Sequence, residues 1–96
     1  MSPPLYKLRV PDSLAALVRG MHPHLKRKVK AALKAILLEP HSGKALKGEL
    51  LGLRSFRVGR FRIIYRVSDR KEIQLVAIGP RESIYEQTYQ TLKKES

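Results

Sequence analysis

Residues 54–67 read R-S-F-R-V-G-R-F-R-I-I-Y-R-V, and the fold can be built up from them. Apolar residues alternate with polar or basic ones on both sides of Gly59, which is typical of two β-strands that each bury one face. Gly59 and Arg60 supply the two residues of a tight antiparallel hairpin. By strand parity, Arg57 and Arg62 share one face of this hairpin. The other face carries the apolar side chains of Phe56, Val58, Phe61, Ile63 and Tyr65.

The chain beyond the hairpin predicts one more strand and a helix. Ser68 to Lys71 form a second polar turn, residues 73–78 follow as a third strand, and Gly79-Pro80 closes it. Residues with helical spacing then indicate a terminal helix that ends in a frayed basic tail. Its apolar and small positions are Ile84, Thr88 and Leu92, with Tyr85 and Tyr89 beside them.

The chain before the hairpin predicts a strand and two helices. Tyr6 to Val10 alternates apolar and basic residues, and Pro11-Asp12-Ser13 stops that strand and offers a side-chain N-cap to a first helix. Its apolar stripe is Leu14, Leu17, Val18 and Met21. A longer second helix ends at Glu39-Pro40. Its apolar face is Leu25, Val29, Ala32, Leu33, Ile36 and Leu37. The glycine-rich segment 41–53 is expected to be loop and turn.

The order of elements predicts an α+β fold in a single domain, residues 1–96. It consists of an N-terminal strand, an α-helical hairpin, a three-stranded antiparallel meander and a C-terminal helix. Ninety-six residues are too few for two hydrophobic cores. We expect the helices to cover one face of the sheet, which leaves the other face free to meet a ligand.

The composition points to a polyanionic partner. Twenty Lys and Arg against eight Asp and Glu give a formal charge of +12, and nucleic acid is the favoured counterpart of such an excess. A merely soluble surface and membrane binding are the alternatives. The absence of cysteine, of a long apolar stretch and of a signal-peptide pattern predicts a cytoplasmic protein without a membrane segment.

Four side chains are the candidates for chemistry: Arg57, Arg62, Arg81 and Tyr85. Arg81 follows the third strand directly, and Tyr85 lies one helical turn later. Guanidinium groups hold a phosphodiester and stabilise the charge that develops on phosphorus, while RNA supplies its own 2′-hydroxyl nucleophile. The alternative is that the arginines are solvated surface charges and that Tyr85 is an aromatic at the edge of the core.

Other kinds of site lack support in the sequence. The residues His22, His24 and His41 have no metal-ligand spacing and are interpreted as surface residues. The chain has no phosphate-binding loop of Walker type, no nucleophilic triad and no suitable pair of carboxylates. We therefore expect neither a metal nor a cofactor.

Two stretches resemble the RelE/ParE toxin superfamily. They are L-K-G-E-L-L-G-L-R-S-F-R-V-G-R-F-R-I-I-Y-R-V (46–67) and I-G-P-R-E-S-I-Y-E (78–86). The resemblance, which also covers the order of the earlier elements, implies a toxin of a type II toxin–antitoxin system. RelE-type members are metal-independent endoribonucleases that cut messenger RNA on the ribosome, and an antitoxin protein wraps around and neutralises them.

The resemblance also implies roles for individual residues. Arg57 matches a basic residue near the scissile phosphate, and Arg62 matches the arginine that stabilises the transition state. Arg81 matches the arginine implicated in leaving-group protonation or charge neutralisation. Tyr85 matches a tyrosine that stacks on or orients the nucleotide. Further residues expected to contact RNA are Arg54, Ser55, Arg60, Lys44 and Lys47.

One position departs from the family pattern. Ser55 stands where RelE carries a lysine implicated in activating the 2′-hydroxyl. Arg54 or Arg60 could compensate by position, but arginine rarely loses its proton and is a poor general base. The general base is therefore left unassigned.

Two other functions are compatible with the same fold. One is a non-enzymatic poison of DNA gyrase, as in ParE-type members of the superfamily, which generally lack the complete set of basic residues and tyrosine. The other is a plain nucleic-acid-binding module whose basic residues only follow phosphates. The expected partners of the favoured function are an antitoxin protein, the ribosome and messenger RNA, with no membrane.

Overall fold

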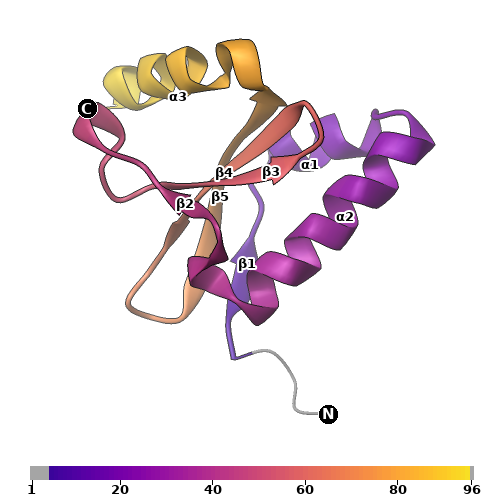
Figure 1. Ribbon diagram of the computed structural model, residues 1–96, viewed down its shortest axis with the longest axis horizontal. Helices are drawn as coiled ribbons and strands as arrows, with labels where there is room; N and C mark the ends of the chain where they lie inside the picture. The colour runs from indigo at the N-terminus through magenta and orange to yellow at the C-terminus, as the bar shows by residue number, and fades with distance from the viewer. Residues whose placement is uncertain (1–4, 96) are drawn as a thin grey trace.

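The computed structural model describes residues 5–95, which form a five-stranded sheet with helices on both sides (Figure 1). The strands are β1 (Lys7–Arg9), β2 (Lys44–Ala45), β3 (Arg54–Val58), β4 (Phe61–Val67) and β5 (Glu72–Pro80). The α-helices are α1 (Asp12–Arg19), α2 (Pro23–Leu38) and α3 (Arg81–Glu95). Two 3-10 turns, η1 (Pro40–Ser42) and η2 (Gly48–Leu50), flank β2.

The sheet has the strand order β1-β5-β4-β3-β2. The expected meander of β3, β4 and β5 is confirmed as antiparallel, and the α+β class is confirmed with it. The sheet extends at both edges: β1 pairs in parallel with β5, and β2 pairs antiparallel with β3. The segment 41–53, which was expected to be loop and turn, thus contributes a short edge strand.

The β3–β4 hairpin turns at the predicted place. Val58 and Phe61 are paired across a two-residue turn, and Gly59 takes a φ of +59°, which favours glycine because it has no Cβ. Within the hairpin, Arg57 is paired directly with Arg62. The prediction that Arg57 and Arg62 lie on the same face of the hairpin is therefore confirmed.

The helical hairpin also forms, with two differences in α1. Helix α2 ends at Leu38, as the Glu39-Pro40 pair predicts. The prediction of a side-chain cap for α1 is wrong, because Pro11 occupies the N-cap position and no side chain bonds to the free amides. Leu17 is also largely exposed, at 44%, because the short α1 presents only part of its apolar stripe to the core.

The two faces of the sheet carry separate cores. On one face, α1 and α2 pack against the strands around the fully buried side chains of Val29, Ile36, Ile63, Tyr65 and Ile73. On the other face, α3 packs through Ile84 against Ile64 and Leu53. The expectation that the helices cover a single face is therefore wrong (Figure 1).

Helix α3 reaches the second face because β5 passes into it without a loop. Pro80 ends the strand and Arg81 begins the helix. Gly79 leaves room for the returning helix, since a Cβ at this position would lie 2.9 Å from Ile84 Cδ1. The helix continues through Lys93 and Lys94, which were expected to form a frayed tail.

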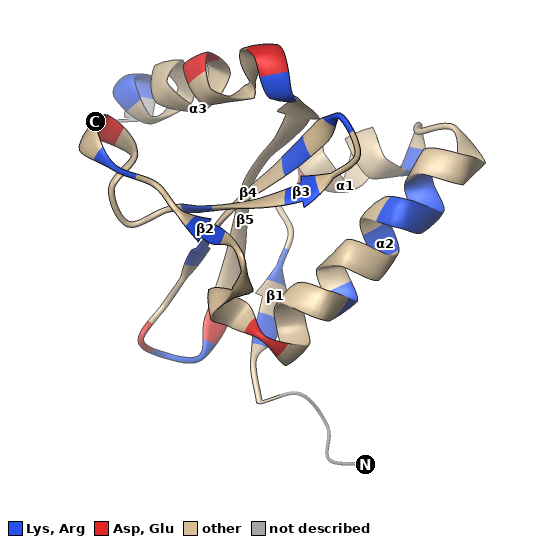
Figure 2. Cartoon of the chain, viewed as in Figure 1, with Lys and Arg blue, Asp and Glu red and all other residues tan. Residues whose placement is uncertain are grey.

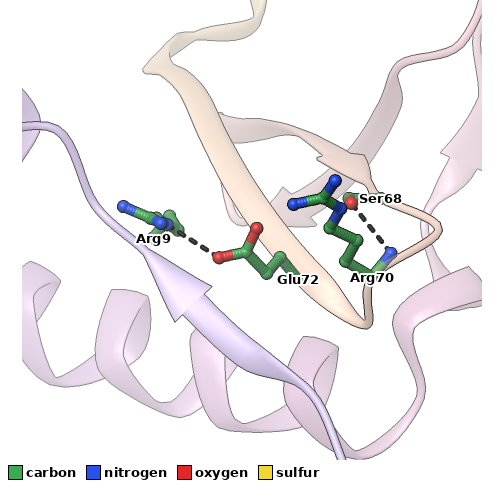
Figure 3. Close-up of polar contacts among 4 residues, drawn as sticks. All are labelled: Arg9, Ser68, Arg70 and Glu72. Atoms are coloured by element: carbon green, nitrogen blue, oxygen red, sulfur yellow. Dashed lines mark hydrogen bonds and ion pairs between the residues drawn. The ribbon is translucent and has the colours of Figure 1, made fainter.

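The β4–β5 turn and the β1 edge are joined by polar contacts (Figure 3). Arg9 Nε donates to Glu72 Oε2 at 2.8 Å, and this hydrogen bond lowers the pKa of the Glu72 carboxyl below its usual value. In the predicted polar turn, the backbone N–H of Arg70 donates to Ser68 Oγ at 3.1 Å. These contacts lie at the start of β5, at the opposite end of the strand from the junction with α3.

No helix within residues 5–95 has the length and apolar character needed to cross a membrane. The expectation that the N-terminus is not a signal peptide concerns in part residues 1–4, which lie outside the described residues.

Candidate functional site

A cleft of about 440 Å³ opens on the second face of the sheet, beside α3. Side chains from β2, β3, β4 and α3 contribute to it. Its lining residues are Lys44, Leu46, Ser55, Arg57, Arg62, Arg81 and Tyr85. The structure therefore brings together all four candidates for chemistry, and their roles stay predictions.

The convergence follows from strand pairing and from the β5–α3 junction. Arg57 and Arg62 point to the same side of the hairpin because they are directly paired residues. Arg81 is the first residue of α3, and its backbone N–H donates to the carbonyl of Arg60 at 2.9 Å. This bond ties the start of the helix to the hairpin turn. Figure 2 shows basic residues on the hairpin and at the start of α3.

Tyr85 is held in the cleft by Ser55. The Ser55 Oγ and the Tyr85 Oη lie 3.0 Å apart and share a hydrogen bond. Ser55 is 7% exposed and Tyr85 is half-buried, so water competes little for the serine hydroxyl. The phenol oxygen thereby has a fixed position between β3 and α3.

Arg62 leans toward the hairpin turn. Its Nη1 donates to the carbonyl of Phe61 at 3.0 Å and to that of Gly59 at 3.2 Å. A guanidinium carries five N–H groups, so these contacts leave donors that can bind a ligand in the cleft. Arg57 is exposed and adds a second guanidinium directly across the strand pair.

The cleft has a one-sided charge. Four of its lining residues are cationic and none is acidic. Among the side chains of residues 5–94, Arg57, Arg62 and Arg81 form no ion pair, and Glu72 pairs with Arg9 outside the cleft. Like charges placed opposite each other in a sheet are destabilising. A bound anion would relieve this repulsion, and a phosphodiester has the charge and the acceptor oxygens to do so.

The other residues expected to contact RNA are divided. Lys44 and Ser55 line the cleft, whereas Lys47 and Arg60 are exposed outside it. Arg54 is also absent from the cleft. Its Nη1 donates to the carbonyls of Gly43 at 2.7 Å and His41 at 3.0 Å. Strand parity could have indicated this, because position 54 has the same parity as the apolar positions of β3.

The segment that carries Lys44 is anchored by a buried tyrosine. Tyr65 Oη donates to the carbonyl of Pro40 at 2.7 Å and accepts from the backbone N–H of Gly43 at 2.9 Å. A Cβ at Gly43 would lie 2.5 Å from that oxygen, so the close approach requires glycine. Tyr65 was expected in the core and is fully buried there. Its role in holding β2 had no signal in the sequence.

The histidines lie where they were expected. His22, His24 and His41 are all exposed. Among the residues that the structure describes, no three or more His, Cys, Asp or Glu side chains are grouped as metal ligands.

Comparisons with known proteins point to one group of toxins. The family model described as the ParE toxin of the type II toxin–antitoxin system, parDE, matches residues 7–85. No curated protein matches the chain.

Solved structures share the fold. The RelBE2 toxin–antitoxin complex from Mycobacterium tuberculosis contains a chain that is 26% identical, with a TM-score of 0.69 over 79% of this chain and 98% of that one. A mutant of the E. coli toxin RelE in the free state is 19% identical, with a TM-score of 0.73 over 94% of this chain and 96% of that one. In the archaeal RelE–RelB complex from Pyrococcus horikoshii, the matching chain is 22% identical, with a TM-score of 0.65 over 79% of this chain and 94% of that one.

Proposed function

This chain belongs to the ParE toxin family of type II toxin–antitoxin systems, and we propose that it is an endoribonuclease that cuts messenger RNA on the ribosome. One observation carries the proposal: Arg57, Arg62, Arg81 and Tyr85 line a single cleft that contains no carboxylate. This is the arrangement that stabilises a phosphodiester as negative charge builds on it.

The proposed reaction uses the nucleophile that RNA contains. The 2′-hydroxyl oxygen attacks the adjacent phosphorus, a bond from O2′ to phosphorus forms, and the bond from phosphorus to O5′ breaks. The 2′-hydroxyl loses its proton and the departing 5′-oxygen gains one. The products are a 2′,3′-cyclic phosphate and a 5′-hydroxyl end.

Each side chain in the cleft has a proposed part in this reaction. Arg57 and Arg62 hold the non-bridging oxygens of the scissile phosphate from β3 and β4 and neutralise the charge of the transition state. Arg81, at the start of α3, stabilises the departing 5′-oxygen. Tyr85 stacks on or orients the nucleotide, which brings the 2′-oxygen into line with the bond that breaks.

No side chain of the cleft is proposed as a dedicated general base. Ser55 occupies the place of the family's lysine, and its hydroxyl is engaged with Tyr85 at 3.0 Å. Arginine retains its proton at any physiological pH. The proposed mechanism therefore relies on orientation and charge stabilisation, with water accepting the proton of the 2′-hydroxyl in the open cleft.

The proposed partners are the ribosome, messenger RNA and an acidic antitoxin. The solved structures from Mycobacterium tuberculosis and Pyrococcus horikoshii with this fold are complexes of a toxin with its antitoxin. The net charge of +12 suits an acidic segment that folds on the toxin surface. Co-expression with the product of the adjacent reading frame should give a complex that co-purifies at moderate salt, and failure to co-purify counts against this partner. The proposed place of action is the cytoplasm, where translation occurs.

Primer extension on translated messenger RNA tests the reaction. Induction of the chain should produce new 5′ ends within coding regions and arrest growth. Arg81→Ala and Tyr85→Ala should each abolish these ends while the thermal unfolding midpoint stays near that of the original protein. Intact transcripts during growth arrest would contradict the proposal.

A second candidate function is inhibition of DNA gyrase, which the match to the ParE family model favours. In that case transcripts stay intact, DNA replication stalls, and the purified chain inhibits supercoiling by gyrase. The two candidates differ in what they require of the cleft, because a protein inhibitor needs no group of arginines around a phosphate. If neither effect occurs, a plain nucleic-acid-binding role remains.

A further inference from the structure

Helix α2 carries a concentration of positive charge that the cleft does not use. Its sixteen residues, P-H-L-K-R-K-V-K-A-A-L-K-A-I-L-L, include no Asp or Glu. The cations of the helix are Lys26, Arg27, Lys28, Lys30 and Lys34. Figure 2 shows this basic run on α2, separate from the basic residues of the hairpin and of α3.

Four of these cations form one continuous strip, which we call the α2 strip: Lys26, Arg27, Lys30 and Lys34. Positions three and four apart are neighbours on a helix surface, so each member of the strip adjoins another. The strip spans about 12 Å along the axis at a rise of about 1.5 Å per residue. Arg27, Lys30 and Lys34 are exposed and Lys26 is partly buried, whereas Ala32 and Ile36 on the other side of the helix are buried.

Stability of the fold does not account for the α2 strip. Like charges four residues apart, such as Lys26 with Lys30 and Lys30 with Lys34, destabilise a helix. Lys26 and Arg27 also lie near the N-terminus, where the helix dipole favours acidic groups, and the first turn contains none. No carboxylate whose side chain the structure describes forms an ion pair with the strip. A bound ligand of opposite charge would neutralise this repulsion and so accounts for the arrangement.

The α2 strip and the cleft face opposite sides of the molecule. Figure 1 shows α2 and α3 on opposite faces of the sheet. The cleft opens on the face beside α3. One phosphate cannot contact both surfaces. If both surfaces bind RNA, they bind different segments of it.

We propose that the α2 strip docks the protein onto the phosphate backbone of a structured RNA segment, while the cleft receives the strand that is cut. An RNA helix presents rows of phosphates, and lysine and arginine contacts to phosphate position a protein without reading sequence. The α2 strip supplies four such groups in a row. Docking through it concerns RNA binding alone and does not require cleavage, so it goes beyond the proposed reaction.

The chemistry of α2 favours RNA over a membrane or an acidic protein. A helix that lies in a membrane inserts its apolar face, whereas Val29 and Ile36 are completely buried inside this protein. Cores of protein–protein interfaces are rich in aromatic residues and poor in lysine. The exposed side of α2 presents mainly Lys, Arg and Ala, with one exposed leucine, Leu38, at its end.

Binding to RNA at several salt concentrations tests the proposal. The probes are a labelled RNA duplex and purified ribosomes, and the test variant is Lys30→Gln with Lys34→Gln. The matched control removes two exposed cations elsewhere, with Lys7→Gln and Arg70→Gln. The test variant should bind both probes about tenfold more weakly than the control at moderate salt. The slope of its logarithmic affinity against logarithmic salt concentration should become shallower by about one for each phosphate that it no longer binds.

Three outcomes would overturn the proposal: equal binding by test variant and control, a loss that affects only anionic vesicles, or a loss that affects only an acidic antitoxin. A Leu38→Ser variant adds a check, because RNA docking predicts unchanged binding whereas an amphipathic protein partner predicts a loss. Cleavage is measured separately at saturating protein. A chain that binds RNA through the α2 strip yet cuts no messenger RNA would refute the proposed reaction and leave this inference intact.

Discussion

The two faces of the sheet use the same strands for opposite purposes. On the face under α1 and α2, Ile63 and Tyr65 are fully buried in the core. The Tyr65 hydroxyl is hydrogen-bonded to the backbone of Pro40 and Gly43. On the face beside α3, Arg57 and Arg62 oppose each other without a carboxylate. Ile63 and Arg62, which are adjacent in sequence, therefore lie in different environments, one completely buried and the other lining the cleft. Both faces carry a core, but the α3 face also places Arg57 and Arg62 opposite each other in a cleft, which costs some stability.

Ile63→Ala should disrupt the core between the sheet and helices α1 and α2, and should give the largest loss of stability. The side chain is completely buried, and truncating a buried isoleucine costs about 2–5 kcal/mol because it leaves a cavity. Chemical denaturation would measure this as a lower midpoint with an unchanged slope. A loss below about 1 kcal/mol would mean that this face is not closely packed.

Arg62→Ala, one residue away, should have the opposite effect, with a large loss of RNA cleavage and little change in stability. RNA cleavage should fall by about 10²–10³-fold, as for the loss of one preorganised donor to a developing charge. Stability should stay level or rise, because the repulsion between Arg57 and Arg62 disappears. The two measurements are cleavage in a translation extract and thermal unfolding. Equal losses in both would show that the two faces are not separate in function.

Ser55→Ala should affect the cleft more mildly, by about three- to tenfold in cleavage, since one partly buried hydrogen bond is worth about 0.5–1.5 kcal/mol. The effect should act through Tyr85. In a Tyr85→Phe background, Ser55→Ala should therefore cause almost no further loss of cleavage. With Tyr85 intact, Ser55→Thr keeps a hydroxyl at this position and should retain most of the cleavage rate. Additive effects of the two single substitutions would contradict a positioning role for Ser55.

Glu72→Gln should give the smallest effect, because the Arg9–Glu72 pair lies at the surface, where an ion pair contributes little, and outside the cleft. The folded protein holds the pKa of Glu72 below its unfolded value. The pair therefore stabilises the fold above the unfolded pKa, and this stabilisation is lost as pH falls through the folded pKa. The variant should be slightly less stable than the original protein at neutral pH and equally stable in acid. Thermal unfolding between pH 7 and pH 3 would test this, and a difference that persists in acid would contradict it.

Several parts of the fold and the site were predictable from local pattern. The alternation on either side of Gly59 placed Arg57 and Arg62 on the same side of the hairpin, and the structure pairs them directly. The helical spacing around Val29 and Ile36 located α2 and its buried face. Other parts were not predictable. The hydrogen bonds from Tyr65 to Pro40 and Gly43 had no signal in the sequence, whereas the place of Arg54 outside the cleft could have been read from strand parity.

The sequence by itself determined β3, β4 and β5, the turns between them and which of their side chains share a face, because alternation and glycine conformation are properties of neighbouring residues. Only the tertiary structure decided which face of the sheet receives α3, that β1 joins β5 in parallel, and that Tyr65 anchors the segment carrying Lys44. A strand has two faces that are locally equivalent for a following helix. Packing between residues distant in sequence, such as Ile84 against Leu53 and Ile64, selects one of them and so places α3 beside the cleft.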